Sequence, residues 1–405
     1  ASVLQPDGKI VIAGIATWGS NNLYCVARFN ADGSVDQTFN GKGYRIDNYD
    51  TNDDLSDVGL QSDGKIVVVG RITHNVLLIR YHSDGRLDTA FSGDGVVQTD
   101  FGGTDIGKAI HVFSDDKILV AGTSGGKIAL ARYLPNGGLD TEFGNQGTKK
   151  IDLGASVSVT KMEVLPEGDF FISGSISQNE DDFYLAKFDE NGVLDPAFGD
   201  SGIVTTDFEN STEVCNALLI KKNGKIVQAG FSLVEFEYSD MAIAQFLPDG
   251  TPDSSFSEDG KHHFKFPNLP LSWALDVGEM KNGSIILGGL TGVSAWYPRF
   301  ALTKLRPEGF NTAVEDKIIS RINLKVSPNP VHDQAKLSFS LSQNEGLSGF
   351  LLDQNGRIVK TLFKDQIKSK GNHQIEFSLN ELSSGVYHLI IKGKRSFSQV
   401  KLVKL

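Results

Sequence analysis

Short apolar runs recur along the first three quarters of the chain, and polar turns separate them. In one unit the runs lie at 58–61, 65–70, 76–82 and 95–101, and an Asp-Gly pair follows the first and the third of them. Asp-Gly is a frequent hairpin turn, since both central residues of a type I′ turn take positive φ. The pattern therefore predicts four short antiparallel strands in each unit of roughly 55 residues.

The same unit returns six times along the sequence. One element reads DGKIVIAG at 7–14 and DGKIVVVG at 63–70, and it ends on a glycine in every copy. These glycines are Gly14, Gly70, Gly122, Gly174, Gly230 and Gly288. A second element ends on Phe39, Phe91, Phe143, Phe198 and Phe256, whereas the sixth copy breaks off at Phe310. A fixed period with such landmarks is typical of repeat architectures.

The strand at 66–69, Ile-Val-Val-Val, is apolar on both faces instead of alternating. A strand of this kind must be covered from above and from below, which stacked sheets achieve. We therefore expect an all-β fold with a β-propeller of at least six four-stranded repeats over residues 1–310. A β-solenoid is the alternative. Because the first residues already read as the middle of a repeat, we also expect further sequence ahead of Ala1.

The last part of the chain has a different rhythm. Strand-like runs lie at 324–326, 335–341, 349–352, 358–363, 374–378, 386–391 and 398–403. Seven strands in so short a stretch predict a small Ig-like β-sandwich over residues 322–405, joined to the repeats by a linker at 311–321.

The repeated pattern, such as LIRYHSDGRLDTAF at 78–91, resembles the delta-60 repeat of bacterial extracellular proteins. The resemblance covers residues 1–310 and implies a propeller-like β repeat with no assigned activity.

The C-terminal landmarks resemble the type A sorting domain of the type IX secretion system of Bacteroidota. They are LKVSPNP at 324–330, LLDQNGRIVKTL at 351–362, LSSGVYHLIIKG at 382–393 and KLVKL at 401–405. The sorting-signal residues that the resemblance implies are Pro328, Asn329, Pro330, Asn355, Gly356, Gly385, Tyr387, Lys401, Leu402, Val403, Lys404 and Leu405.

The resemblance implies a route and partners. The protein would reach the periplasm, and the outer-membrane translocon with its PorV-family shuttle barrel would recognise residues 322–405. The cargo would then be secreted or held at the cell surface. We expect a propeller that binds a glycan or a protein there, as an adhesin or a gliding-associated factor. A propeller enzyme acting on polysaccharide and a structural surface-layer component are the alternatives.

The charge is divided between the two parts. The chain carries −11 overall, but residues 320–405 hold 13 Lys and Arg against 6 Asp and Glu, a net of +7, so the remainder holds −18. An acidic majority argues against nucleic-acid binding, which needs a basic face. A basic module is also suited to electrostatic steering toward an acidic partner, and solubility of a small sandwich is the alternative explanation of its charge. No apolar run is long enough for a membrane helix.

We find no catalytic constellation, and we expect neither enzyme activity nor a cofactor. His262 and His263 are adjacent, so in a strand they point to opposite faces, and they are interpreted as surface histidines. Cys25 and Cys215 stand among apolar neighbours and are interpreted as buried, inert thiols.

The repeated Asp-Gly-x-x-Asp segment permits a calcium interpretation through Asp32, Asp36, Asp84 and Asp88. We favour no metal, since calcium takes six to eight oxygens and a turn alone accounts for these residues. Arg28, Arg80, Arg132 and Lys187 are expected to pair with Asp36, Asp88, Asp140 and Asp195.

The irregular loops are the better ligand candidates, because loops on one propeller face are the usual binding surface. They carry the aromatic residues Trp18, Phe236, Tyr238, Trp296 and Tyr297, which we predict as a ligand surface. Local packing across the blade tops is the alternative.

Overall fold

A computed structural model gives the fold as two compact units, Ala1–Thr312 and Ala313–Leu405. It describes residues 1–18, 21–49, 54–178, 180–208, 212–235, 238–264, 266, 269, 271–292, 298–305, 320–321, 324–353, 357–393 and 396–405. The regular elements in these residues are strands, apart from one short 3-10 turn, η1 (Phe39–Gly41). None of the described residues belongs to a helix long and apolar enough to cross a membrane.

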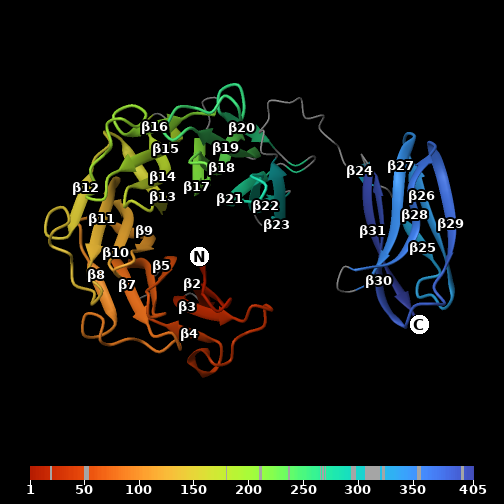
Figure 1. The fold of residues 1–405 in the computed structure, drawn as a ribbon, viewed down its shortest axis with the longest axis horizontal. Helices are drawn as coiled ribbons and strands as arrows, with labels where there is room; N and C mark the ends of the chain where they lie inside the picture. Colours follow the sequence, from red (N-terminus) through yellow and green to blue (C-terminus); the bar gives the residue numbers. More distant parts are fainter. Residues whose placement is uncertain are drawn as a thin grey trace. The chain divides into compact units, whose positions relative to one another are not determined.

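The first unit consists of small antiparallel blades that follow one another around an arc (Figure 1), and one parallel bridge between Ser239 and Leu271 joins the last two blades into a single sheet. Blade 1 is β1 (Ser2–Leu4), β2 (Ile10–Trp18), β3 (Asn21–Phe29) and β4 (Tyr44–Asp47); blade 2 is β5 (Asp54–Leu60), β6 (Ile66–Ile72), β7 (Asn75–Tyr81) and β8 (Val96–Thr99); blade 3 is β9 (Asp105–Val112), β10 (Ile118–Ser124), β11 (Lys127–Tyr133) and β12 (Thr148–Ile151). Blade 4 is β13 (Ser156–Val164), β14 (Phe170–Ser177), β15 (Asp181–Phe188) and β16 (Ile203–Thr206); blade 5 is β17 (Thr212–Ile220), β18 (Ile226–Glu235), β19 (Tyr238–Phe246) and β20 (Lys261–Phe264); blade 6 has β21 (Leu271–Glu279), β22 (Ile285–Gly292) and β23 (Pro298–Leu305).

The core of this unit lies between the blades, as the doubly apolar strands predicted. In β6, Ile66 and Val68 pack into the cluster shared with blade 1, while Val67 and Val69 pack into the cluster shared with blade 3. All four side chains are buried. The all-β propeller prediction is therefore confirmed.

In blades 2 to 6, the glycine that ends the repeated strand faces a β-bulge in the first strand of its blade. A Cβ on Gly122 would lie 2.0 Å from the carbonyl oxygen of Ile106, and one on Gly174 would lie 1.7 Å from that of Ser158. In blade 6 the equivalent residue is Gly289, whose Cβ would lie 1.9 Å from the Trp273 oxygen. The assignment of Gly288 to this position was wrong by one residue, because two glycines stand side by side there.

The hairpin turns differ from the predicted type I′. In the turn at 61–65 the Gly64 amide donates to the Gln61 carbonyl, and only Gly64 has positive φ (80°). This is a type I turn followed by one left-handed residue, a common longer hairpin loop. The Asp side chain contributes by a different route, since Asp63 Oδ1 accepts the Lys65 amide at 3.0 Å.

Neighbouring blades are joined by a repeated contact that we call the latch: the phenylalanine ending the second element of one blade covers the Asp-Gly or Asn-Gly turn of the next. A Cβ on Gly85 would lie 2.8 Å from the Phe39 ring, and one on Gly137 would lie 2.9 Å from the Phe91 ring. The amide of Asn40 also donates to the Asp84 carbonyl at 2.7 Å. The latch explains why Phe and Gly recur together.

The repeated Arg or Lys completes the latch. Arg80 donates to Asp88 Oδ2 at 2.8 Å, and its guanidinium lies 4.4 Å from the Phe91 ring centroid. It also donates to the Pro135 carbonyl in blade 3. The predicted pairs of Arg28, Arg132 and Lys187 with Asp36, Asp140 and Asp195 form as well and are confirmed.

The two cysteines differ in their surroundings. Cys215 is buried as predicted, and burial raises the pKa of its thiol to about 12. Cys25 is only half-buried, so its interpretation as a buried thiol was wrong. Its equivalent in blade 2, Leu77, is buried against blade 1. Within the described residues, no blade lies on the corresponding side of Cys25.

The second unit is a sandwich of two sheets. One has the order β24 (Ser320–Arg321), β31 (Ser396–Lys404), β30 (Gly385–Gly393), β27 (Glu345–Leu352) and β28 (Ile358–Lys368), and the other has the order β25 (Lys325–Ser327), β26 (Gln334–Leu341) and β29 (Gly371–Ser378). All seven predicted strands form. Residues 320–321, which were assigned to the linker, add a short strand parallel to β31.

Candidate functional site

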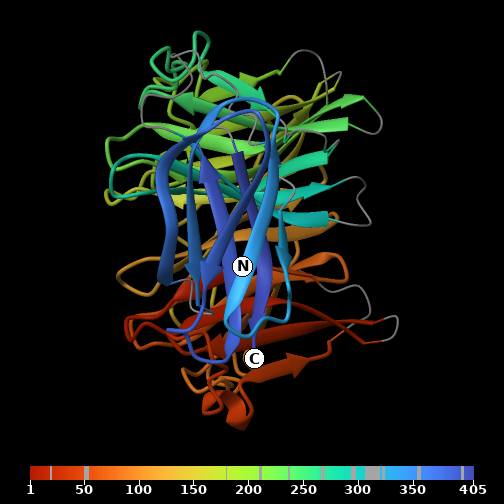
Figure 2. The same ribbon diagram turned by 90° about the vertical axis from the view of Figure 1, so that its right-hand side faces the viewer.

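One end of the first unit gathers the features that could bind a ligand, and we call it the loop end. It comprises the ends of β2, β14, β18 and β22 and the starts of β3, β15, β19 and β23. Figure 2 shows the β2–β3, β18–β19 and β22–β23 hairpins projecting to the same side of this unit.

Few of the predicted aromatic residues fall within the described part of the structure. Phe236, Trp296 and Tyr297 lie outside the described residues, and Trp18 is placed only by its backbone at the end of β2. Tyr238 is the first residue of β19, and its side chain is exposed at the loop end. One of the five predicted residues is thus seen at the surface.

The sequence analysis missed an aromatic pair that lies between two blades. Phe231 from β18 and Trp273 from β21 stack with their ring centroids 5.2 Å apart, between blades 5 and 6. The indole of Trp273 donates from Nε1 to Ser239 Oγ at 2.7 Å, which fixes the ring. Phe231 directly follows Gly230, where the other repeats carry Ile15, Arg71, Thr123, Ser175 and Leu290. That departure from the repeat was the available signal.

Two histidines lie in β20, the outer strand of blade 5. His263 Nδ1 lies 3.3 Å from Asp240 Oδ2, and His262 stacks on Phe264. Both side chains are half-buried on this outer strand, so they lie at the surface but are less exposed than the sequence analysis expected. The two rings do make separate contacts, as adjacent strand residues should.

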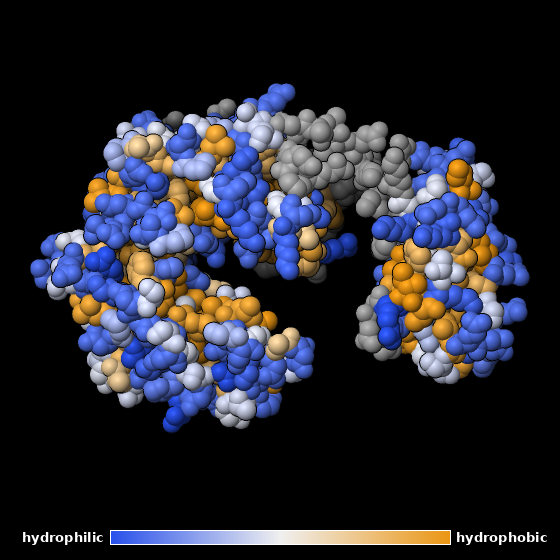
Figure 3. All heavy atoms as spheres, in the orientation of Figure 1, coloured by the Kyte–Doolittle hydropathy of each residue, from blue (hydrophilic) through white to orange (hydrophobic). Residues whose placement is uncertain are grey.

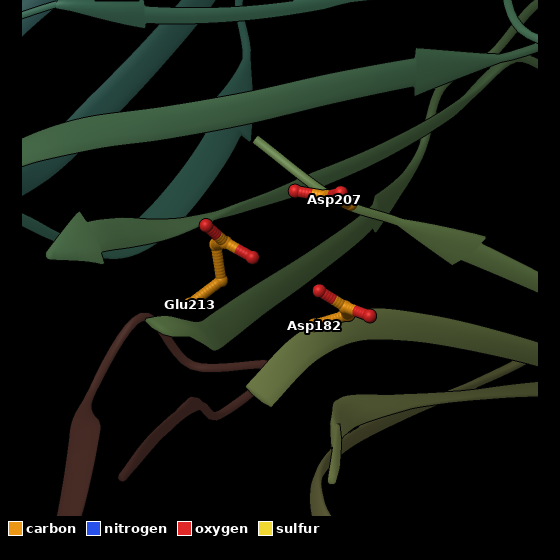
Figure 4. A group of neighbouring side chains, drawn as sticks. All are labelled: Asp182, Asp207 and Glu213. Carbon is orange, nitrogen blue, oxygen red and sulfur yellow. The ribbon is translucent and has the colours of Figure 1, made fainter. Parts of the chain in front are cut away.

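Three carboxylates converge at the loop end between blades 4 and 5. Asp182 is the second residue of β15, Asp207 follows β16, and Glu213 lies in β17, and they point toward one another (Figure 4). One oxygen from each lies within 4.8 Å of the others. Partial burial and the charge of Asp207 raise the pKa of Asp182. Among the described residues, this is the one group of three or more acidic, His or Cys side chains close enough to share a metal ion.

A substitution in the repeat creates this carboxylate group. At the positions of Asp182 and Asp207, blade 3 has Lys127 and Asp152, which form an ion pair at 2.6 Å. Blade 4 replaces the lysine with an acid. Carboxylate oxygens suit calcium or magnesium, although three side chains supply only part of a calcium shell. The sequence analysis missed the group because its members come from three strands.

A pocket of about 280 Å³ opens beside this group. Thr206 and Asp207 line it from blade 4, and Phe246, Asp259 and Lys261 line it from blade 5. Lys261 Nζ donates to the Asp207 carbonyl at 2.5 Å. The pocket therefore has a polar wall of both charges and an apolar wall.

The residues of the calcium interpretation have protein partners instead. Asp32 Oδ1 accepts the Ser34 amide at 2.9 Å, and Asp84 Oδ1 accepts the Arg86 amide at 3.1 Å, as turn caps do. Asp36 Oδ2 accepts from Arg28 at 2.7 Å. Asp88 accepts from Arg80, as described above.

The sorting-signal residues of the second unit largely come together. Asn329 donates from Nδ2 to the Lys401 carbonyl at 2.7 Å and accepts the Val403 amide at 2.9 Å. Tyr387 pairs with Leu402, and Gly385 with Lys404, across β30 and β31. Pro328 and Pro330 flank Asn329, whereas Asn355 and Gly356 lie outside the described residues. Two motifs at opposite ends of the domain thus form one structure.

Family models account for both units. Residues 5–39, 61–91, 114–143 and 221–256 match a domain of unknown function (DUF5122) β-propeller. Residues 325–405 match a secretion system C-terminal sorting domain. The chain is a DUF5122 β-propeller repeat protein that ends in a type IX sorting domain. This repeat protein is accordingly a cargo exported by the type IX system, and its destination is the cell surface or the medium.

Solved structures similar to the repeat protein share only distant likeness with it. A PL25 ulvan lyase is 10% identical, with 76% of this chain and 78% of that chain covered and a TM-score of 0.41. A protein from Lactobacillus plantarum is 11% identical, with 93% and 87% covered and a TM-score of 0.44. Likenesses of this degree bear on neither activity nor ligand. No curated protein matches the sequence.

Proposed function

We propose that this cargo acts at the cell surface or outside it by binding a glycan or a protein through the loop end of its propeller, in adhesion or gliding. Its sorting domain, residues 322–405, engages the outer-membrane translocon and the PorV-family shuttle barrel. The loop end is then the working surface, and the second unit is the export signal.

The observation that carries the binding proposal is the stacked pair Phe231 and Trp273, together with the exposed Tyr238 in the same β18–β19 hairpin as Phe231. Flat aromatic faces bind the apolar faces of sugar rings and also anchor protein partners. The carboxylates of Asp182 and Asp207 lie at the same end and could accept hydrogen bonds from hydroxyl groups.

A glycan array and a panel of immobilised surface proteins, probed with the full chain, test this proposal. Tyr238→Ala is expected to weaken binding of the ligand found by about tenfold, since a well-placed aromatic contributes about 1–2 kcal/mol. Tyr44→Ala is the matched control, because Tyr44 is an exposed tyrosine on the outer strand of blade 1. Absence of binding to every probe, or equal losses in both variants, would contradict the proposal.

The export route has a separate test. Deletion of residues 322–405 is expected to leave the propeller folded in the periplasm, because the sorting domain forms its own compact unit. Fractionation with a periplasmic marker locates the protein, and protease resistance of the propeller is the control for folding. Continued delivery of the truncated chain to the surface would refute the assignment.

The carboxylate group between blades 4 and 5 favours a second candidate, an enzyme that acts on polysaccharide. A carboxyl whose pKa is raised, close to a second carboxyl, is the usual arrangement for general acid catalysis. Assays for new reducing ends, which report hydrolysis, and for unsaturated products, which report lyase cleavage, test it on a panel of polysaccharides. Asp182→Asn is expected to abolish the activity. Activity that survives this substitution would exclude the group as the catalytic site.

A further inference from the structure

Blade 6 carries an apolar face of the kind that every other blade buries. Phe300 and Leu302 in β23 are 76% and 59% exposed. By strand register they are equivalent to Val76 and Leu78 in blade 2, which are 1% and 0% exposed because blade 3 covers them. The face of blade 6 is therefore built as an interface.

Blade 1 carries the complementary face at the other end of the arc. Ile12 in β2 is 42% exposed, while its equivalent in blade 2, Val68, is fully buried against blade 1. Cys25 on the same face is half-buried, whereas its equivalent Leu77 has no exposure. Figure 3 shows hydrophobic residues gathered over blade 1 and an open space between blades 1 and 6.

Blade 1 also has a vacant latch position. The turn glycines Gly85, Gly137, Gly192 and Gly250 each meet the phenylalanine of the preceding blade. Within the described residues, no atom lies within 4 Å of a Cβ built on Gly33, which holds the same place in blade 1. The same is true of Gly14, although its equivalents in blades 2 to 6 each face a bulge carbonyl.

We propose that the open end of the propeller binds one further four-stranded blade of this same repeat. Such a blade would cover Phe300 and Leu302 with one face and Ile12 with the other. Its latch phenylalanine would cover the turn at Gly33. The choice of occupant rests on continuity with the existing interfaces, since the chain repeats this combination of apolar face and latch at each junction from blade 1 to blade 5.

The register of the repeat specifies a direct test. Ala1 pairs with Ala13 as Asp57 pairs with Val69 and as Ala109 pairs with Ala121. A copy of residues 57–108 placed directly before Ala1 therefore adds a blade in register. The last residues of the copy, 105–108, also extend the first strand of blade 1, and Lys108 of the copy supplies the bulge of that strand.

The readout is the reactivity of a thiol introduced at position 302. Leu302→Cys is made in a Cys25→Ser background, where the remaining Cys215 is fully buried. In the chain without the copy, the new thiol is expected to react freely with a thiol reagent, and the added blade is expected to slow the reaction at least tenfold. Tyr238→Cys in the same background is the control, and its reactivity is expected not to change.

Two measurements on the chain without the copy keep the test decisive if the extended chain folds poorly. Leu302→Glu is expected to leave the melting temperature unchanged, and light scattering is expected to show a monomer. A dimer in which the thiol at position 302 is protected would identify a second copy as the occupant. A monomer in which that thiol is protected would show that blades 1 and 6 close directly. Either result, or a reactive thiol at position 302 in a folded chain with the added blade, overturns the proposal.

Discussion

At the scale of single residues, the repeat is determined by close approach of backbone to backbone. In blades 2 to 6, a bulge in the first strand turns one carbonyl toward the second strand. Only a residue without a Cβ leaves room for that carbonyl. The glycine is therefore required by packing and not by positive φ, which distinguishes it from the turn glycines.

Gly174→Ala is expected to destabilise the propeller by more than about 1–3 kcal/mol, the usual cost of overpacking, because the clashing atom belongs to the backbone. Gly14→Ala is the matched control, since space is open around Gly14, and its effect is expected to stay within about 0.5 kcal/mol. Urea unfolding of both variants measures the difference. Equal losses would show that the bulge relaxes around the methyl group.

Buried aspartates of the repeat make stability depend on pH. Burial of Asp253 opposes its ionisation, but hydrogen bonds from Lys225, Ser255 and Gln245 outweigh burial and hold the pKa at about 2. The ordinary value for Asp is about 3.9. The ionised carboxylate therefore stabilises the folded state above about pH 4, and this contribution is lost as the pH falls through about 2.

Asp253→Asn is accordingly expected to lower the free energy of unfolding at pH 6 by about 2 kcal/mol and to have less effect at pH 2. Denaturant titrations at pH 6, 4, 3 and 2 give the two curves. Glu258→Gln is the control, because Glu258 is an exposed carboxylate close by in the sequence. Parallel curves for wild type and Asp253→Asn would show that this carboxyl does not supply the pH dependence.

At the scale of elements, the latch converts a local turn into a joint between sheets. Arg132 pairs with Asp140 within blade 3 and lies 4.7 Å from the ring centroid of Phe143, which in turn covers the turn at Gly192 in blade 4. Each blade thus depends on the next one for full burial of its second element, as expected for repeat proteins with nearest-neighbour stability.

Phe143→Ala is expected to cost about 3–5 kcal/mol, because the ring is fully buried and nothing else can fill its place. The loss should be concentrated at the junction of blades 3 and 4. Hydrogen exchange of β11 and β15 amides is expected to accelerate more than that of β2. Uniform acceleration across all blades would mean that the propeller unfolds as a single unit.

The elements were more predictable than the site. Apolar runs and Asp-Gly turns predicted the strands of blade 2, because strand period and turn chemistry act over a few residues. The pair of Phe231 and Trp273 and the carboxylates of Asp182 and Glu213 join strands far apart in sequence. Their proximity depends on how blades stack, which one repeat does not encode. The choice of Gly288 over Gly289 in blade 6 was wrong for the same reason. Only the pairing of Gly289 with Ala274 in the neighbouring strand shows which of the two glycines faces the bulge.

At the scale of the whole molecule, the division of charge coincides with the division of labour. The acidic residues lie mainly in the propeller, where many of them cap turns or pair with the latch Arg and Lys. The excess of Lys and Arg lies in the sorting domain, and Lys401 and Lys404 belong to its terminal strand. Electrostatic steering by this domain would weaken with salt.

The contact between Asn329 and β31 gives the export step a residue-level test. Asn329→Ala removes two hydrogen bonds to the terminal strand, worth about 1–3 kcal/mol together, and should release the end of that strand without unfolding the sandwich core. We expect less protein at the surface and more in the periplasm. His332→Ala, three residues on and exposed, is the control and should be delivered normally. Normal delivery of Asn329→Ala would mean that the machinery recognises the terminal strand without this support, because the propeller itself is unchanged in both variants.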